Sequence, residues 1–343
     1  MAVCRHGLHE IDVRGCSRGS AGDATCHGLA VEILLTGASG FVGSHVAVAL
    51  AAAGHRVRCA TRKPDQAIAQ HADRVWVELD LERPETLPSA LAGCDAAIYL
   101  VHGMDAGHDD YPVRERREAE AFAAAAASAG LARIVYLGGV MPAHGASRHL
   151  ASRAQTGEVL RGGPVETIEL RAAMIVGAGS ASWMMVRDLA RRLPAMLLPR
   201  WLRNVSYPIA IEDVVAGIVA ALALPASGSR ILELPGPERI RHADLLQRVA
   251  LAMGHRRMMI SVPVLTPRLS SYWIALVTRT SLAMAKELVE GVRHDLVPSG
   301  ESLWQLVPHR PMRLDDAIAR ALGDDDAAQV PSPAMRGRLA HRT

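Results

Sequence analysis

The chain has 343 residues, half of them hydrophobic and 3% aromatic, and its 38 basic residues nearly balance its 35 acidic residues. This balance argues against nucleic acid as the main partner, because nucleic-acid-binding domains carry a clear basic excess. The N-terminus has no apolar segment of the kind that directs secretion. Five cysteines in a chain of this length do not form a disulfide framework, so we expect a cytoplasmic protein.

The two ends of the chain differ in composition from the rest. Residues 1–28 are polar and rich in glycine, and residues 324–343 combine prolines with scattered charge, so both are expected to be disordered. The first segment contains several side chains of metal-ligand type, namely Cys4, Cys16, Cys26, His6, His9 and His27. They include no C-x-x-C pair and match no common zinc spacing, so no metal is expected.

Between these ends, short apolar runs typical of buried strands alternate with longer segments typical of helices. In chain order, the expected strands are VEILLT, HRVRCAT, RVWVEL, DAAIYLV, ARIVYLGG and VETIELRAAMIVG. Helices are expected at 41–54, at 111–130 and at about 147–161. Such alternation implies right-handed crossovers and a parallel sheet. We therefore predict an α/β fold with a doubly wound Rossmann sheet.

The pattern is less regular from about residue 178 to residue 323. Helices are expected at SWMMVRDLARRL, IEDVVAGIVAALAL and RHADLLQRVALAMG, and a strand at RILELPG. We assign this region to a smaller C-terminal substrate lobe, which completes a Rossmann domain spanning residues 29–323.

Three glycines follow the first strand at every third position, Gly37, Gly40 and Gly43. The uncharged run that holds them is long enough to span a bilayer, but clustered glycines favour a strand, a tight turn and a helix. Backbone N–H groups and the helix dipole bind phosphate at a helix N-terminus. Gly37 suits the turn, Gly40 the approach of a diphosphate, and Gly43 the packing of the helix on the sheet. The same dinucleotide site is expected to include Thr36, Ser39, Phe41 and Val42.

The end of the second strand bears on the choice of cofactor. Sites selective for NAD place an acidic residue there to bind the ribose hydroxyls, whereas this chain has Thr61 followed by Arg62. A guanidinium matches the 2′-phosphate of NADP in charge and shape, so we expect NADP(H) rather than NAD(H). An ordinary solvated loop is the alternative. After the third strand, Asp80 and Leu81 are placed to meet the adenine.

Together these motifs resemble the short-chain dehydrogenase/reductase superfamily. The resemblance is to its atypical NAD(P)H-binding branch, which includes NmrA-like proteins and the Rossmann accessory subunit of respiratory complex I. TGASGFVG fits the T-G-x-x-G-x-x-G fingerprint of the extended and atypical members, and LDLERPETL, YLVHGM, ELRAAMIVGAG and YPIAIEDVV resemble later elements of the family. The resemblance covers roughly residues 31–322. It implies a site related to those of epimerases and dehydratases, with the nicotinamide near His102 and Gly138.

The chain departs from this family at the catalytic positions. Standard members use a serine after the fifth strand and a Tyr-x-x-x-Lys pair on the next helix, in which the tyrosine exchanges a proton with the substrate. Here Gly138 and Gly139 stand in place of the serine, the helix has neither tyrosine nor lysine, and Ala154 aligns with the lysine. Two glycines imply a roomier and less polar site, which favours a bulky, apolar substrate.

Few other side chains are candidates for proton transfer. His102 is expected near the nicotinamide, either as a proton relay or, as the simpler alternative, as a hydrogen-bonding partner of cofactor or backbone. Arg153 lies one residue from the lysine position and is a candidate contact of ribose or substrate. Tyr136 is expected in the core. A loop over the cofactor is expected at Asp105, His108, Asp109 and Asp110, whose spacing matches no known metal site.

Two apolar segments of the lobe have alternative interpretations. Trp183, Met184 and Met185 either line a substrate pocket or belong to the core. The segment 265–289 combines aromatic and aliphatic residues with a few cations. It either contacts a membrane surface or a quinone-like substrate, or it is an ordinary packed helix, which the pattern favours.

Two functions remain open at this point. The first is an NADP(H)-dependent oxidoreductase of atypical mechanism, acting on a small-molecule substrate with a proton from His102 or from water. The second is a nucleotide-binding protein without turnover, such as a redox sensor, an assembly factor or a scaffold. The missing catalytic triad favours the second, and fold alone does not decide between them.

Overall fold

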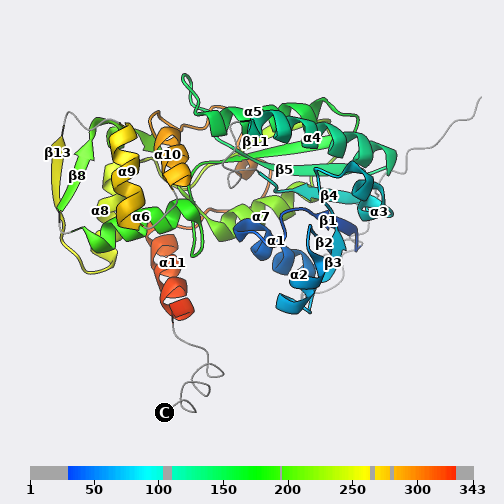
Figure 1. Ribbon diagram of the computed structural model, residues 1–343, viewed down its shortest axis with the longest axis horizontal. Helices are drawn as coiled ribbons and strands as arrows, with labels where there is room; N and C mark the ends of the chain where they lie inside the picture. The colour runs from blue at the N-terminus through cyan, green and yellow to red at the C-terminus, as the bar shows by residue number, and fades with distance from the viewer. Residues whose placement is uncertain (1–29, 103–109, 194, 263–266, 279–281, 330–343) are drawn as a thin grey trace, which may run out of the picture. The chain divides into compact units, whose positions relative to one another are not determined.

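The computed structural model describes residues 30–102, 110–193, 195–262, 267–278 and 282–329. The predicted N-terminal extension, the predicted loop residues Asp105, His108 and Asp109, and the end of the predicted tail lie outside these ranges. The described residues from Val31 onward form one unit of contacting elements, built around a parallel β-sheet (Figure 1).

The main sheet has seven strands in the order β11-β6-β5-β4-β1-β2-β3. They are β1 (Glu32–Leu35), β2 (Arg56–Thr61), β3 (Val75–Glu78), β4 (Ala96–Tyr99), β5 (Arg133–Gly139), β6 (Glu166–Ala172) and β11 (Arg230–Leu234). All neighbours are parallel, and Ile33 of β1, beside the central β4, pairs with Val57 on one side and Ala96 on the other. The strand order reverses at β1, which is the doubly wound Rossmann arrangement. The predicted fold class is therefore confirmed.

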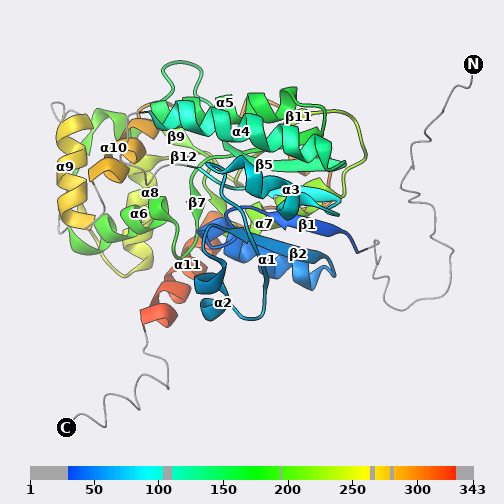
Figure 2. The same cartoon turned by 45° about the vertical axis from the view of Figure 1, so that its right-hand side comes forward.

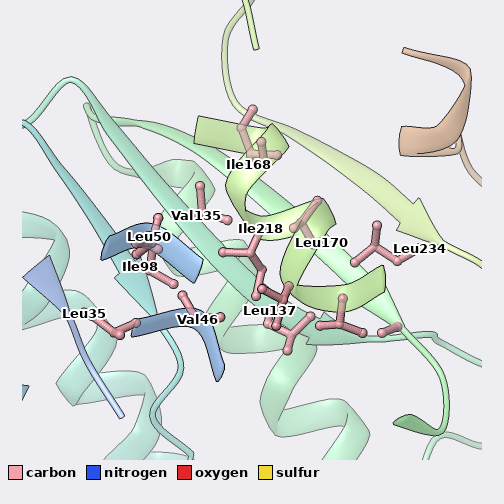
Figure 3. Packing of buried hydrophobic residues seen from close by; sticks show 14 of the residues in the cluster. Leu35, Val46, Leu50, Ile98, Val135, Leu137, Ile168, Leu170, Ile218 and Leu234 are labelled. Carbon is pink, nitrogen blue, oxygen red and sulfur yellow. The ribbon is translucent and has the colours of Figure 1, made fainter. Parts of the chain in front are cut away.

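Helices cover both faces of this sheet (Figure 2). One face packs against α1 (Phe41–Ala52) and α7 (Ile211–Leu222), and the other packs against α3 (Leu87–Leu91), α4 (Tyr111–Ser128) and α5 (Arg148–Gly162). Figure 3 shows the first of these cores, where Leu35, Ile98 and Val135 of neighbouring strands belong to one cluster with Val46 and Ile218. Strands that are apolar on both faces are typical of a buried parallel sheet. The short α2 (Pro64–Gln70) and η1 (Pro84–Thr86) follow β2 and β3.

Two late elements return to the main sheet. The strand β11 pairs in parallel with β6, and α7 contacts β5 and β6. We had expected both in the C-terminal lobe, but they extend the Rossmann core. The lobe is therefore made from stretches before and after this return rather than from one continuous segment.

The lobe consists of short strand pairs and helices. The strand pairs are β7 (Ile175–Val176) with β10 (Ile209–Ala210), β8 (Ala195–Pro199) with β13 (Met258–Val262), and β9 (Val205–Ser206) with β12 (Ile240–Arg241). The helical segments are α6 (Ala181–Arg192), η2 (Arg200–Arg203), α8 (His242–Ala252), α9 (Pro267–Thr278), α10 (Leu282–Gly291), η3 (Leu303–Gln305) and α11 (Leu314–Gln329). Trp183 is fully buried in a cluster with residues of α8 and α11, so it belongs to the core of the lobe. Met185 is also buried, whereas Met184 is exposed.

The last helix extends beyond the boundary expected from composition. We predicted a disordered tail from residue 324, but α11 continues to Gln329. Asp325 is buried, accepts a hydrogen bond from the Trp183 indole N–H at 2.9 Å, and pairs with Arg187 at 2.7 Å. These two contacts fix the end of the helix against α6.

The described residues contain no helix that is both long enough and apolar enough to cross a membrane. The uncharged run at 33–54 forms β1, the glycine turn and α1, as expected.

Candidate functional site

The turn between β1 and α1 has the geometry of an anion-binding loop. Gly37 adopts the left-handed conformation with φ +66°, and a Cβ there would lie 3.0 Å from the Leu100 carbonyl oxygen. A Cβ on Gly43 would lie 2.1 Å from the Gly37 carbonyl oxygen, so only glycine lets the helix approach the turn this closely. Gly40 is the N-terminal cap of α1, and the first turn has no capping side chain and no acidic residue.

The N-terminus of α1 is therefore available to a phosphate. The first N–H groups of a helix lack partners inside it, and here Phe41 and Val42 supply two of them. Ser39 and Gly40 are exposed at this end. The backbone in this turn fits the diphosphate of a dinucleotide, because unpaired donors and the positive end of the helix dipole meet at one point.

Thr36 has a different role from the one its position suggested. It is fully buried, and its hydroxyl bonds the Ile98 carbonyl at 3.2 Å and the Leu100 N–H at 3.0 Å. The side chain therefore ties the end of β1 to β4 and positions the loop, and it is not aimed at a cofactor.

The end of β2 offers a cation without an ion-pair partner. Arg62 is exposed, and no carboxylate or carbonyl in the described part of the chain pairs with it. Thr61 lies opposite Glu78 in the sheet register. Sequence analysis did not consider this acidic residue as a neighbour of the cofactor site. That carboxylate pairs with Arg83 at 2.5 Å, so it is already neutralised.

The two residues expected near the adenine are partly used by the protein itself. The Asp80 carboxylate accepts hydrogen bonds from the Glu82 N–H at 3.1 Å and from Arg83 at 3.3 Å. Leu81 is buried in the core, which leaves only its backbone for a ligand.

The two glycines at the end of β5 do not open a space. A Cβ on Gly138 would lie 3.0 Å from a carboxylate oxygen of Glu169, and a Cβ on Gly139 would lie 2.8 Å from Leu150. Our expectation of a roomier site at these positions is therefore wrong. Glu169 is itself buried and pairs with Arg161 and Arg171. Apolar and ion-paired side chains fill the volume that the glycines leave.

Three polar side chains meet beside this strand end. The rings of His102, after β4, and His149, in the first turn of α5, contact edge to face with centroids 6.0 Å apart. Arg153 lies one helical turn after His149 and donates to the Leu137 carbonyl. Nδ1 of His149 and Nε of Arg153 are buried, and neither has a hydrogen-bond partner among the described residues.

Both histidines are held in the neutral form. Burial first, and then the Arg153 cation, lower the pKa of His149 to about 3. The same causes lower the pKa of His102 to about 4, but that residue as a whole is exposed, so solvent moderates its shift. Of the two histidines, His149 is therefore the one whose imidazole is more strongly held in the neutral form.

Sequence reasoning missed His149, although a signal was present. His149 and Arg153 are four residues apart, the spacing of the family's tyrosine and lysine, and each lies one residue before the aligned position. Glu287 of α10 accepts a hydrogen bond from the backbone N–H of His149, so the lobe reaches this point.

Tyr136 lies in the core, as expected. It is buried, and its hydroxyl donates to the Arg153 carbonyl at 2.9 Å. Burial raises its pKa to about 12, which makes it a poor proton donor. The described residues form no group of three or more side chains that would hold a metal ion.

Comparison with known proteins agrees with this geometry. Residues 37–188 match the NAD(P)H-binding family model. The chain is 25% identical over 286 residues to a ceramide reductase of Caulobacter vibrioides, covering 81% of this chain and 89% of that protein.

Solved structures show the same fold. Triphenylmethane reductase of Citrobacter sp., complexed with NADP(H), superposes with a TM-score of 0.67 at 15% identity, over 84% of this chain and 99% of that one. A nucleoside-diphosphate-sugar epimerase of Staphylococcus aureus gives a TM-score of 0.66 at 18% identity, over 84% and 99% of the two chains. Residues 37–188 are thus similar to NAD(P)H-binding domains, and the whole chain shares its fold with these two solved structures.

Proposed function

We propose that the protein is an NADPH-dependent reductase whose substrate is bulky and largely apolar, with a carbonyl or imine carbon as the hydride acceptor. The observation that carries this proposal is the group of His102, His149 and Arg153 at the carboxyl edge of the sheet that also bears the glycine turn. Bound NADPH supplies the hydride, and the residues of this chain supply position and polarity.

His149 is assigned the role of hydrogen-bond donor to the reacting oxygen. With a pKa of about 3 its imidazole is neutral at neutral pH, and a neutral imidazole carries one N–H donor. Such a donor polarises a carbonyl, and the Arg153 cation stabilises the negative charge that develops on the oxygen. The substrate carbon gains the hydride, and the carbonyl oxygen or imine nitrogen bonded to it gains one proton that the imidazole passes on from water.

A preference for NADPH is supported by the charges at the end of β2. Arg62 is unpaired and exposed, whereas Glu78, the nearest acid in register, is neutralised by Arg83. A free carboxylate would bind the ribose hydroxyls of NAD, but a free guanidinium favours the 2′-phosphate.

An apolar substrate is supported by the side chains at the triad positions. Leu150 lies against Gly139, at the position of the family's tyrosine. A curated relative is named a ceramide reductase and a structural neighbour a triphenylmethane reductase, and both names denote large, mainly apolar molecules. We therefore place long-chain ketones and imines, with and without an amide head group, first among substrates to test.

The test uses NADPH deuterated at the transferred position and a panel of such compounds. The proposal requires that NADPH is consumed and that one deuterium appears on the carbon that was the carbonyl or imine carbon. Tight binding of NADPH without turnover of any member would instead favour the second candidate, a non-catalytic sensor, assembly factor or scaffold. The absence of the tyrosine and lysine from α5 is the observation that favours that alternative.

A further inference from the structure

The strand β13 presents an apolar face to the outside of the lobe. Exposure alternates along it, with Arg256, Met258 and Ile260 exposed and the residues between them half-buried. Met258 is 65% exposed and Ile260 is 40% exposed. Side chains of a strand alternate between its two faces, so Met258 and Ile260 share the outer face of β13, and Arg256 lies two residues before the strand.

The inner face of the same strand is occupied. Met259 packs on the core of the lobe, and Arg257 donates to the carbonyls of Ala190 and Arg191 on α6. A strand with its inner face packed in this way usually exposes polar side chains on its outer face. Here both described residues of the outer face, Met258 and Ile260, are apolar and exposed.

The backbone of β13 forms strand hydrogen bonds along one of its two edges. It pairs in parallel with β8 in a two-stranded sheet, and the two strands lie side by side in Figure 1. Proteins usually protect an exposed apolar edge with charge, a bulge or a covering segment. No further strand pairs with β13 in the part of the chain that the structure describes.

The sequence segments that supply the two strands of this sheet carry basic but no acidic residues. Residues 189–211 and 245–286 contain no aspartate or glutamate, although both stretches contain several arginines. Arg200 and Arg203 of η2, directly after β8, and Arg256, directly before β13, are exposed and have no partner among the described residues. Two of the cations therefore follow β8, and the third precedes β13.

We propose that this surface, Met258 and Ile260 flanked by Arg200, Arg203 and Arg256, rests on an anionic lipid bilayer. The arginines match the negative headgroups, and each cation near such a surface strengthens binding about fivefold. The methionine and isoleucine side chains enter the boundary of the acyl chains. Tyr272 of α9 is exposed, and the Lys286 ammonium lies 5.6 Å from the centre of its ring. Tyrosine is enriched at membrane interfaces.

Lipid attachment of this kind is peripheral and does not depend on the proposed reductase activity. The experiment is co-sedimentation of the full-length protein with vesicles of phosphatidylcholine, and with vesicles of equal parts phosphatidylcholine and phosphatidylglycerol. The expected result is binding to the anionic vesicles, weaker at high salt because salt screens exposed charges, and little binding to the neutral ones.

Variants assign the binding to this surface. Arg200→Gln, Arg203→Gln and Arg256→Gln are each expected to weaken it about fivefold. The double variant Met258→Ser/Ile260→Ser is expected to weaken it on the order of tenfold. The matched controls are Val75→Ser, an exposed apolar residue on the edge strand β3, and Arg117→Gln, an exposed arginine of α4. Both controls should bind like the wild type, and thermal melting should show every variant to be folded.

Three results would overturn the proposal. The first is equal sedimentation with neutral and anionic vesicles, and the second is anionic binding that the controls weaken as much as the surface variants do. The third is absence of vesicle binding together with a change of mass in solution for Met258→Ser/Ile260→Ser, since the surface would then contact a second copy of the chain. Sedimentation needs neither cofactor nor substrate. A negative result would therefore contradict the membrane proposal without bearing on the proposed reductase activity.

Discussion

The ring of His149 lies edge-on to the ring of His102, with centroids 6.0 Å apart and ring planes inclined at 75°. One residue follows β4 and the other begins α5, so the contact joins two elements at the carboxyl edge of the sheet, where open α/β sheets bind their ligands. Arg153, one turn further along α5, keeps positive charge beside both rings. This arrangement places a neutral imidazole and a cation four residues apart, each one residue before the position that aligns with the tyrosine or lysine of standard short-chain dehydrogenases/reductases.

Cofactor choice is expected to depend on Arg62. Replacing it with alanine removes a charge-assisted phosphate contact of about 1.5–3 kcal/mol, so affinity for NADPH should fall about tenfold or more while affinity for NADH stays unchanged. Calorimetric titration of both cofactors measures this ratio. The control is Arg56→Ala on the same strand, whose side chain is 74% exposed and pairs with Glu32. An unchanged ratio in Arg62→Ala would show that Arg62 does not bind the 2′-phosphate.

The glycines of the turn are expected to differ in what they tolerate. Gly43→Ala would place a Cβ 2.1 Å from a backbone oxygen and should destabilise the fold, whereas Gly40→Ala, at 3.1 Å, should fold. Because its methyl group meets the diphosphate, Gly40→Ala should weaken NADPH binding. Gly162→Ala, where no atom lies within 4 Å, is the control for both. Melting temperature and NADPH titration separate the two effects, and the account fails if Gly43→Ala melts like the wild type.

The end of α11 is expected to contribute to stability. Asp325→Ala leaves the buried Trp183 indole N–H without its acceptor and Arg187 without this partner. The expected loss is about 1–3 kcal/mol of unfolding free energy, measured by denaturant unfolding. Asp326→Ala, at the exposed neighbouring position, should change stability by less than about 0.5 kcal/mol. Equal effects of the two substitutions would mean that the Asp325 contacts do not stabilise the protein.

Stability is expected to fall in mild acid because of His242. Burial lowers its pKa to about 4, and its Nε2 has no partner among the described residues. Between about pH 6.5 and pH 4 the unfolded chain binds a proton that the folded chain does not, so stability decreases as the pH falls, by up to about 1.4 kcal/mol per pH unit. His242→Leu should reduce this slope in a series of melting curves but leave the share that His149 and His102 contribute, whereas His144→Leu, on the surface, should not change it. A slope that His242→Leu leaves unchanged would contradict this assignment.

Local patterns predicted the core of this fold well. The apolar runs became strands β1 to β6, and the glycine spacing became a turn with Gly37 at positive φ. These features depend on nearby residues, which a linear pattern can reveal. The return of α7 and β11 to the main sheet depends on pairing with β6 across many residues, and no local pattern determines that.

The site was less predictable for the same reason. An empty volume was inferred from Gly138 and Gly139, but Glu169 of β6 and Leu150 of α5 fill it from other elements. Thr36 was placed at the cofactor by its motif, yet its hydroxyl faces β4. His149 was overlooked because its importance comes from contact with His102, which lies far from it in the sequence.

The most direct test of the account is the rate of NADPH oxidation by His149→Phe, compared with wild type on the best acceptor of the panel, with NADPH affinity measured in parallel. The account predicts that kcat falls by about 100-fold or more while the Kd for NADPH stays the same, since general acid catalysis contributes about that much. His149→Gln, which keeps an N–H donor, should retain more activity than His149→Phe. A kcat in His149→Phe within a few-fold of the wild type, with cofactor binding intact, would show that the neutral imidazole does not act on the substrate and would contradict the proposed site.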